Sequence, residues 1–173
     1  MLDFSLISLE TSTQNFNHVN FIELINDTIE YCQKAFSQSQ NLEIVFYTND
    51  INEAIINGNS HRIRQVITNL LVNAIKYGDG GLISINLELT NQSKISYWQL
   101  SVSDQGIGLS EDEMESIFKP FFRSSKCKLI PGHGIGLAIC QKIADNHGSQ
   151  LNAVNNNDKG STFYFSIPAV LMG

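Results

Sequence analysis

Apolar residues recur along the chain with two spacings, and each spacing predicts a different kind of element. A spacing of three and four residues, which aligns side chains on one helix face, occurs over residues 21–36, 61–77 and 135–147. Patterns typical of strands, most clearly apolar–polar alternation, occupy other segments: 42–48, 83–89, 98–102, 151–154 and 162–167. Helices and hairpin-like strands intermixed in this way predict a two-layer α/β sandwich.

Capping residues give some of these elements predicted ends. Ser60 is a candidate N-cap for the helix over 61–77, and the glycine-rich segment 78–81 is predicted to end that helix. Ser110 is a candidate cap for a short acidic helix over residues 111–118. These positions predict where the chain leaves its helices and turns back.

The connection between the last two predicted strands contains a run of identical residues, Asn155, Asn156 and Asn157, followed by Gly160. Asparagine and glycine both favour turns. We therefore predict a hairpin here, with the asparagine run as part of its turn.

The length of 173 residues and the 42% hydrophobic content suit one domain with an ordinary core. Leucines at helical spacing in residues 1–10 predict the end of a helix, and the polar segment 11–20 predicts a linker. We therefore expect an upstream helix end and linker over 1–20, the folded domain over 21–168, and a short tail over 169–173.

The charge of the chain argues against one class of partner and favours another. A net charge of −6 does not attract nucleic acid. A local cluster of basic residues, Lys119, Arg123, Lys126 and Lys128, stands out on this acidic background. It suits a small anionic ligand, although a solvated loop rich in lysine is the alternative interpretation.

The cysteines and the hydropathy profile indicate the cellular compartment of the chain. Cys32, Cys127 and Cys140 are odd in number and far apart, which argues against a disulfide framework or a zinc site and favours a reducing compartment. The sequence contains no apolar run long enough to span a membrane and no visible signal peptide. A cytoplasmic location is therefore expected, while a full-length protein can still be anchored in a membrane elsewhere.

A helix rich in asparagine is the first candidate for a binding site. Asn69 and Asn73 are one turn apart on the helix over 61–77, so both project from one face. Their amide oxygens are hard, neutral ligands of the kind Mg²⁺ accepts beside water and phosphate. Lys76 can offset phosphate charge, and the ring of Tyr77 can lie along a base. The alternative is a surface helix with ordinary amides.

An acidic residue at a predicted strand end is the second candidate. Asp104 is followed by Gly106 and Gly108. A carboxylate only accepts hydrogen bonds, and the exocyclic amine of adenine is a donor where guanine presents a carbonyl. Glycines permit positive φ and close approach to a base. The segment therefore predicts adenine recognition, and a plain Asp-x-Gly turn is the alternative.

A glycine loop opening a helix is the third candidate. Gly132, Gly134 and Gly136 precede the helix over 135–147, and a helix start presents free N–H groups to phosphates. No strand immediately precedes the glycines, unlike in a Rossmann motif, and the P-loop pattern is absent from the sequence. Before this loop, Phe118, Phe121 and Phe122 are most simply explained as core residues.

Together, these segments resemble the N, G1, F and G2 boxes of the catalytic, ATP-binding domain of two-component sensor histidine kinases. The resemblance covers residues 21–168. It implies the two-layer fold of the wider superfamily of kinases, gyrases and chaperones, with a mixed, mostly antiparallel sheet covered by about three helices on one face. It also implies ATP and Mg²⁺ as ligands, and a mobile lid over residues 122–131.

The resemblance implies roles for individual residues. Asn73 would bind Mg²⁺, Lys76 a phosphate and Tyr77 the adenine, while Thr162 would complete the hydrogen bonds around Asp104. Catalytic roles fall on Asn69, Lys76 and Arg123. The whole set of expected nucleotide contacts is Asn69, Asn73, Lys76, Tyr77, Asp104, Gly106, Ile107, Gly108, Arg123, Lys126, Gly132, His133, Gly134, Ile135, Gly136, Leu137 and Thr162.

One position separates kinases from the hydrolytic relatives of the superfamily. Those relatives carry a glutamate one helical turn before the metal-binding asparagine, where this chain has Asn69. A neutral amide cannot accept a proton from water, so we expect a kinase that keeps ATP intact until a histidine arrives.

The acceptor histidine itself is not recognisable, because none of the four histidines has the flanking residues of an acceptor box: His18, His61, His133 and His147. The expected partners are thus an upstream dimerisation and phosphoacceptor helical domain, a response regulator, and a second copy in a full-length homodimer. A non-catalytic nucleotide-sensing module and an ATP-hydrolysing relative are the alternatives.

Overall fold

The computed structural model describes residues 15–38, 41–127 and 129–171. Its centre is one mixed five-stranded sheet with the strand order β2-β4-β5-β7-β6. The strand bounds are β2 Glu43–Tyr47, β4 Leu82–Gln92, β5 Ile95–Ser103, β6 Gln150–Asn155 and β7 Ser161–Pro168. β2 runs parallel to β4, and every other neighbouring pair is antiparallel.

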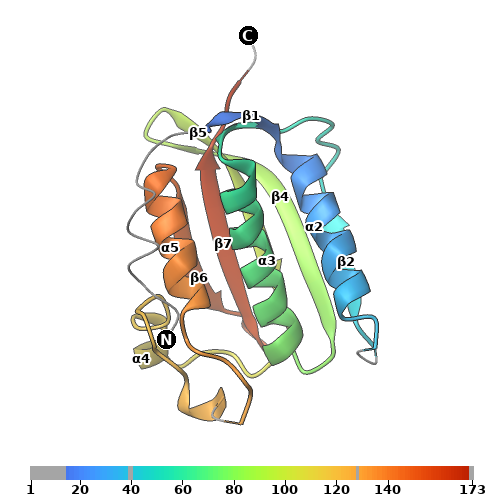
Figure 1. Cartoon of the computed structure of the whole chain (residues 1–173), viewed down its shortest axis with the longest axis vertical. Coiled ribbons are helices and arrows are strands. Elements are labelled where there is room, and N and C mark those ends of the chain that lie inside the picture. Colours follow the sequence, from blue (N-terminus) through green and yellow to red (C-terminus); the bar gives the residue numbers. More distant parts are fainter. Residues whose placement is uncertain (1–14, 39–40, 128, 172–173) are drawn as a thin grey trace.

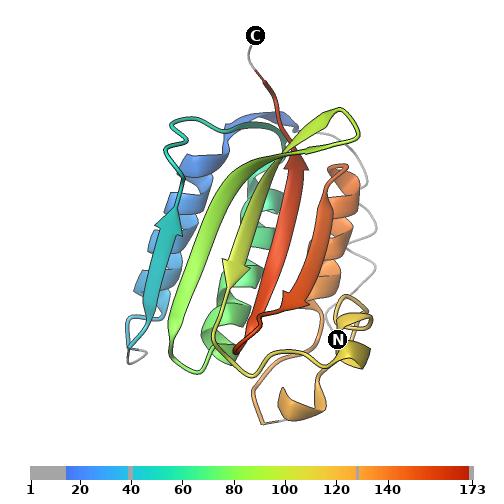
Figure 2. The same ribbon diagram turned by 180° about the vertical axis from the view of Figure 1, so that it is seen from behind.

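Three helices cover one face of this sheet and leave the other face open (Figures 1 and 2). They are α2 Phe21–Ala35, α3 Ser60–Tyr77 and α5 Gly136–Asn146. This arrangement confirms the predicted two-layer α/β sandwich with a mostly antiparallel sheet. It also confirms the strands predicted from apolar patterns and the hairpin between β6 and β7.

The core lies between the helices and the sheet. α3 buries residues three and four apart, as its sequence predicts: Ile63, Val66, Ile67, Leu70, Leu71 and Ala74. Alternate residues of the sheet meet them, including Ile83, Ile85 and Leu87 on β4 and Leu100 on β5. Burial of this apolar surface is the main term that holds the two layers together.

The ends of α3 differ slightly from the prediction. The helix already includes Ser60, and its N-cap is Asn59, whose side chain accepts a hydrogen bond from the N–H of Arg62 at 3.1 Å. Both residue types cap helices well, so propensity alone could not choose between them. The predicted end at Gly78 is confirmed.

The predicted polar linker is wrong over its last residues. β1, Asn17–Asn20, is a strand that pairs antiparallel with β3, Ile55–Gly58. Neither strand was predicted, because β1 has no apolar alternation and owes its conformation to its partner. The beginning of the expected tail is also hydrogen-bonded to β3, since the N–H of Val170 donates to the carbonyl of Ile55 at 2.9 Å. The helix predicted over residues 1–10 lies outside the described residues.

The acidic helix after Ser110 is shorter than predicted. α4 is only Glu111–Met114, although the capping box between Ser110 and Glu113 is present. Turns follow it up to Pro120. The other predicted helix, α5, matches its expected bounds within one residue. Across the described ranges, no helix combines the length and the hydropathy needed to cross a membrane.

Candidate functional site

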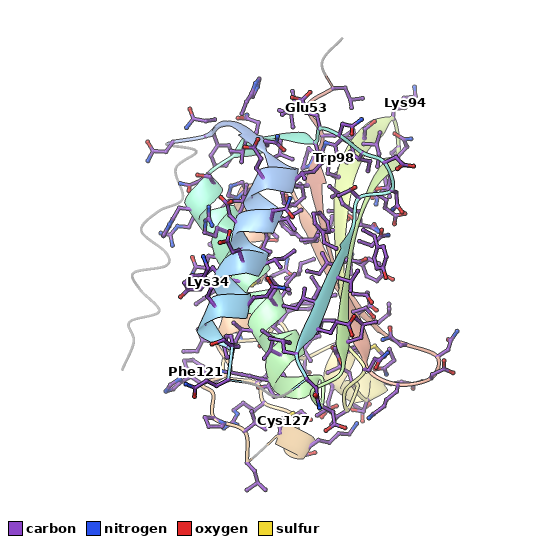
Figure 3. All side chains as sticks on the ribbon, turned by 90° about the vertical axis from the view of Figure 1, so that its right-hand side faces the viewer. Lys34, Glu53, Lys94, Trp98, Phe121 and Cys127 are labelled. Carbon is purple, nitrogen blue, oxygen red and sulfur yellow. The ribbon has the colours of Figure 1, made fainter. Side chains whose placement is uncertain are left out.

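A pocket lies where the C-terminal end of α3, the end of β5 and the segment before α5 meet. Figure 3 shows Cys127, from that last segment, at the end of the molecule opposite Lys94 and Trp98. The pocket is lined by Asn73, Lys76, Tyr77, Asp104, Ile107, Gly108, Leu109, Ile117, Phe122, Arg123, Ser124, Cys127, Pro131, Gly132, His133, Gly134, Leu137, Ser161 and Phe163. The structure thus brings together most of the residues selected from the sequence.

Asp104 is the buried carboxylate of this pocket, with 4% of its surface exposed. Its Oδ1 accepts hydrogen bonds from the N–H of Gly106 at 2.8 Å and of Ser161 at 3.4 Å. Its Oδ2 accepts from the hydroxyl of Ser161 at 2.9 Å. Each carboxylate oxygen has two lone pairs, so Oδ2 keeps the capacity to accept a further donor from the pocket.

The prediction that Thr162 completes this network is wrong, because Ser161 does so. Neighbouring residues on a strand point to opposite faces of the sheet, so only one of the two can reach Asp104. The hydroxyl of Thr162 instead lies 2.9 Å from Oγ of Ser103 and 2.6 Å from Oδ1 of Asn156. The sequence indicated the right strand but the wrong residue.

The glycines after Asp104 have separate roles. Gly108 has a positive φ of 66°, as predicted. Gly106 is outside that region of φ, and a Cβ at this position would overlap the carbonyl oxygen of Tyr77. Gly106 therefore lets the loop pack on the end of α3; the positive φ expected for it is wrong, and it is not one of the described lining residues. The loop bond from the N–H of Ile107 to Tyr77 at 3.3 Å reinforces this contact.

α3 contributes Asn73, Lys76 and Tyr77 to the pocket, but the described lining residues do not include Asn69. The amide nitrogen of Asn69 donates to the carbonyl of Gly136 at 3.3 Å and lies 3.5 Å from Sγ of Cys140. Since a carbonyl oxygen only accepts, it fixes the nitrogen of this amide toward α5. Asn69 thus joins α3 to the helix that follows the glycine loop.

Burial raises the pKa of one phenol and two thiols in and behind the pocket. Burial, with a smaller contribution from Cys127, raises the pKa of Tyr77, although Arg123 opposes the shift. The thiol pKa of Cys127 is also raised, chiefly by burial. Behind the pocket, burial raises the pKa of Cys140 to about 12. The phenol and both thiols are therefore protonated at neutral pH.

Arg123 and Lys126, two of the basic residues before α5, both have partners within the protein. One guanidinium nitrogen of Arg123 donates to the carbonyls of Cys127, at 2.9 Å, and of Ile130. Lys126 lies 3.9 Å from the carboxylate of Glu113 and, unlike Arg123, is not one of the described lining residues. Only Arg123 of these two therefore lines the pocket, and it also joins its own position to Cys127 and Ile130.

Glu113 anchors this segment to α4. Its carboxylate accepts from the hydroxyl of Ser124 and, at 2.8 Å, from the N–H of Ser110. The hydrogen bond from Ser124 is the main cause that lowers the pKa of Glu113, with Lys126 contributing less. The carboxylate that completes the capping box of α4 thus also binds Ser124.

The glycine loop supplies Gly132, His133 and Gly134 to the pocket, together with Leu137 of α5. Ile135 and Gly136 are absent from the described lining residues. Within the described chain no side chain caps the start of α5, where Ile135 is the N-cap residue. The first N–H groups of α5 are therefore available to an anion, as the sequence predicts.

The phenylalanines before the loop divide between core and surface. Phe118 packs edge-on against Phe163 with ring centroids 6.4 Å apart, and Phe122 packs on the core and lines the pocket. Phe121 is 65% exposed with φ of 63°, so the core assignment is wrong for this residue. Its N–H donates to the carbonyl of Gly134 at 2.8 Å, which joins the chain before residue 122 to the glycine loop.

The prediction from sequence missed several apolar and small residues of the pocket. They are Leu109, Ile117, Phe122, Ser124, Cys127, Pro131, Ser161 and Phe163. Leu109 adjoins the predicted Asp104 motif, and proximity alone could have found it. Most of the others also adjoin predicted residues: Phe122 and Ser124 flank Arg123, Cys127 follows Lys126, Pro131 precedes Gly132, and Ser161 and Phe163 flank Thr162. Only Ile117 has no predicted site residue beside it.

The sequence over residues 58–171 matches the family described as "Histidine kinase-, DNA gyrase B-, and HSP90-like ATPase". The adaptive-response sensory kinase SasA of Synechococcus elongatus is 32% identical over 97% of this chain. The autoinducer 2 sensor kinase/phosphatase LuxQ of Vibrio vulnificus is 29% identical over 97% of it. The chain spans 42% of the length of the first and 20% of the second.

Solved structures agree with the sequence comparison. The catalytic domain of histidine kinase ThkA superposes with a TM-score of 0.75 at 31% identity, covering 90% of this chain and 96% of that one. The mycobacterial sensor histidine kinase MprB has the same fold, with a TM-score of 0.76 at 24% identity over 91% and 99% of the two chains.

Proposed function

The chain belongs to the histidine kinase-, DNA gyrase B-, and HSP90-like ATPase family as an ATP-binding catalytic domain of the sensor histidine kinase type, and we propose how it works. It would hold ATP with Mg²⁺ and transfer the γ-phosphate to a histidine on a helical dimerisation domain. The observation that carries this proposal is that one pocket brings together Asn73, Asp104 and the uncapped start of α5.

We assign the adenine to Asp104. A buried carboxylate with spare acceptor capacity suits the exocyclic amine of adenine and disfavours the carbonyl of guanine. The half-buried ring of Tyr77 and the side chains of Ile107 and Leu109 offer apolar walls for the base. This part of the pocket would therefore select ATP over GTP.

We assign the phosphates to the other end of the pocket. Lys76 and Arg123 supply positive charge there, and the uncapped start of α5 supplies N–H groups. Asn73 also lines the pocket, and its amide oxygen is a hard, neutral ligand that Mg²⁺ would use beside phosphate and water. Bound there, the ion would neutralise charge on the phosphates during transfer.

Asn69 supports a kinase rather than an ATPase. As an amide it cannot accept a proton from water, and its nitrogen is engaged by α5 at Gly136. Water in the pocket would thus lack a general base at this position. An incoming histidine brings its own nucleophilic nitrogen and does not need that base.

A response regulator and a second copy of the full-length protein are the further partners we propose. Histidine kinase ThkA, whose catalytic domain resembles this chain, has also been solved in complex with the response regulator protein TrrA. By analogy, a regulator would take the phosphate from the histidine of the helical domain. We also propose that this part of the protein works in the cytoplasm, where ATP is available.

Titration with ATP and Mg²⁺ tests the binding step. Saturable binding with one site per chain should raise the melting temperature in line with RT ln(1 + [L]/Kd). Mixing the chain with a separately prepared acceptor helical domain should then give acid-labile phosphate on a histidine. Binding without transfer would support the nucleotide-sensing alternative, and rapid phosphate release without an acceptor would support the ATPase alternative.

A further inference from the structure

The asparagine run in the β6–β7 connection does more than form a turn. The turn itself is closed by its backbone, since the N–H of Asn156 donates to the carbonyl of Gly160 at 3.0 Å. The side chains of Asn155 and Asn156 instead reach across to the loop that follows β5. Two residues of the hairpin therefore bind a loop about fifty positions earlier in the chain.

Asn155 holds both backbone groups of one residue in the pocket wall. Its Oδ1 accepts from the N–H of Leu109 at 2.7 Å, and its Nδ2 donates to the carbonyl of the same residue. Two bonds in opposite directions fix the peptide groups of Leu109 as a neighbouring strand would. Leu109 lines the pocket beside Ile107 and Gly108. The position of this wall thus depends on one side-chain amide.

Asn156 holds the main chain of Asp104. Its Nδ2 donates to the carbonyl of Asp104 at 2.9 Å and lies 3.1 Å from Oγ of Ser103, while its Oδ1 accepts from the hydroxyl of Thr162 at 2.6 Å. Because the carbonyl of Asp104 can only accept, the orientation of this amide is determined. Asp104 is consequently fixed at its backbone by Asn156 and at its carboxylate by Ser161.

We propose that Asn155 and Asn156 are positioning residues for recognition of the nucleotide base. The inference rests on the proposed ATP-binding function and adds residues that do not line the pocket themselves. Asn156 places the carboxylate that selects the base, and Asn155 places the apolar wall next to it. Small displacements of such groups weaken binding strongly, because a preorganised site does not have to be ordered by its ligand.

The neighbouring Asn157 provides a matched control. It belongs to the same run, it is exposed, and within the described residues its side chain has no hydrogen-bond partner. Replacing Asn157 by alanine changes the composition of the turn without touching the loop after β5. Its effect therefore measures what the hairpin alone contributes.

The test is calorimetric titration of the whole chain with adenosine, ADP and ATP with Mg²⁺. Loss of the two bonds in Asn155→Ala should weaken all three ligands by a similar factor of roughly 5–30 with one site per chain. Similar losses are expected because Asn155 positions groups that face the base, which all three ligands share, and not groups that face the phosphates. Asn156→Asp, which turns an acceptor toward the carbonyl of Asp104, should weaken them at least as much. Asn157→Ala should leave all three affinities unchanged.

The outcomes separate this inference from the proposed function. Wild-type protein that binds none of the three ligands would contradict the proposed function itself. If the wild type binds and Asn155→Ala binds with the same affinity, the inference is overturned. It is also overturned if Asn155→Ala shows fewer binding sites per chain at normal affinity, because that result indicates a purely structural role. If Asn155→Ala fails to fold, Asn155→Ser keeps a donor and an acceptor on a shorter side chain and is read by the same criteria.

Discussion

The carboxylate of Asp104 and the hydroxyl of Ser161 are joined by a 2.9 Å hydrogen bond between the end of β5 and the start of β7. These strands are neighbours in the sheet, and their pairing continues up to Ser103 and Thr162. The bond therefore extends the sheet by one side-chain contact, at the point where the pocket begins. It holds a buried carboxylate in a fixed position while leaving acceptor capacity for a ligand.

The first prediction concerns Asp104→Asn. The new amide can keep its oxygen on the N–H groups of Gly106 and Ser161, and the hydroxyl of Ser161 can reverse to accept from the new NH₂. Folding should thus survive, but the NH₂ would face the amine of adenine as a second donor. Loss of a charge-assisted bond predicts ~10–100-fold weaker ATP binding by calorimetry. The exposed Asp112→Asn is the control, and unchanged affinity in Asp104→Asn would refute the adenine assignment.

The second prediction concerns Asn73→Ala. If its amide oxygen binds Mg²⁺ beside the phosphates, the variant should bind adenosine almost normally and ATP with Mg²⁺ more weakly. Titration of both ligands, with and without Mg²⁺, gives the comparison. Equal losses for adenosine and ATP would mean that Asn73 supports the pocket structurally instead.

The third prediction concerns Asn69→Glu. A carboxylate here can act as a base toward water, and general-base help is typically worth ~10²–10⁴-fold in rate. We expect a smaller gain in phosphate release, because Asn69 is engaged by α5 and the new side chain loses the donor to Gly136. The melting temperature should fall for the same reason.

Asn69→Gln, which keeps a neutral amide, is the matched control for this experiment and should not accelerate phosphate release. The wild-type chain should itself release phosphate very slowly. Fast release by the wild type would place the chain with the hydrolytic relatives and remove the argument from Asn69.

The fourth prediction concerns pH and His147. Burial lowers the pKa of this imidazole from its ordinary 6.5. Its Nδ1 lies 2.8 Å from the carbonyl of Ile143, and its Nε2 accepts from the N–H of Asn59 at 3.1 Å. The ring also stacks on Phe16 at 4.5 Å. The folded state therefore holds a neutral imidazole with one N–H, on Nδ1, and protonation would remove the acceptor that Asn59 uses.

The unfolded state consequently binds more protons than the folded state between pH 6.5 and the lowered pKa of His147. The contribution of the neutral His147 to the free energy of unfolding should be fully present above pH 6.5. It should be lost as the pH drops through that interval. Denaturant unfolding at several pH values should show a smaller slope for His147→Gln than for the wild type. An unchanged slope in His147→Gln would disprove the neutral state assigned to this imidazole.

The sequence by itself determined the layers and the location of the site. Apolar spacing predicted α2, α3 and α5 and every strand of the five-stranded sheet, because the side of an element that faces the core must be apolar. The motifs around Asn73, Asp104 and Gly134 predicted a nucleotide pocket, since their chemistry depends on residues close together in sequence. These features depend on residues close together in the chain, so the pattern of the sequence alone predicts them.

Only the tertiary structure decided which side chains meet. Strand geometry and pairing place Ser161, not Thr162, on Asp104, and the packing of α5 on α3 engages the amide of Asn69 at Gly136. In the same way β1 exists because β3 lies beside it, and Asn155 reaches Leu109 because the hairpin folds back on β5. Each of these contacts joins residues far apart in the chain, and their hydrogen bonds form only when packing of the core has brought the segments together.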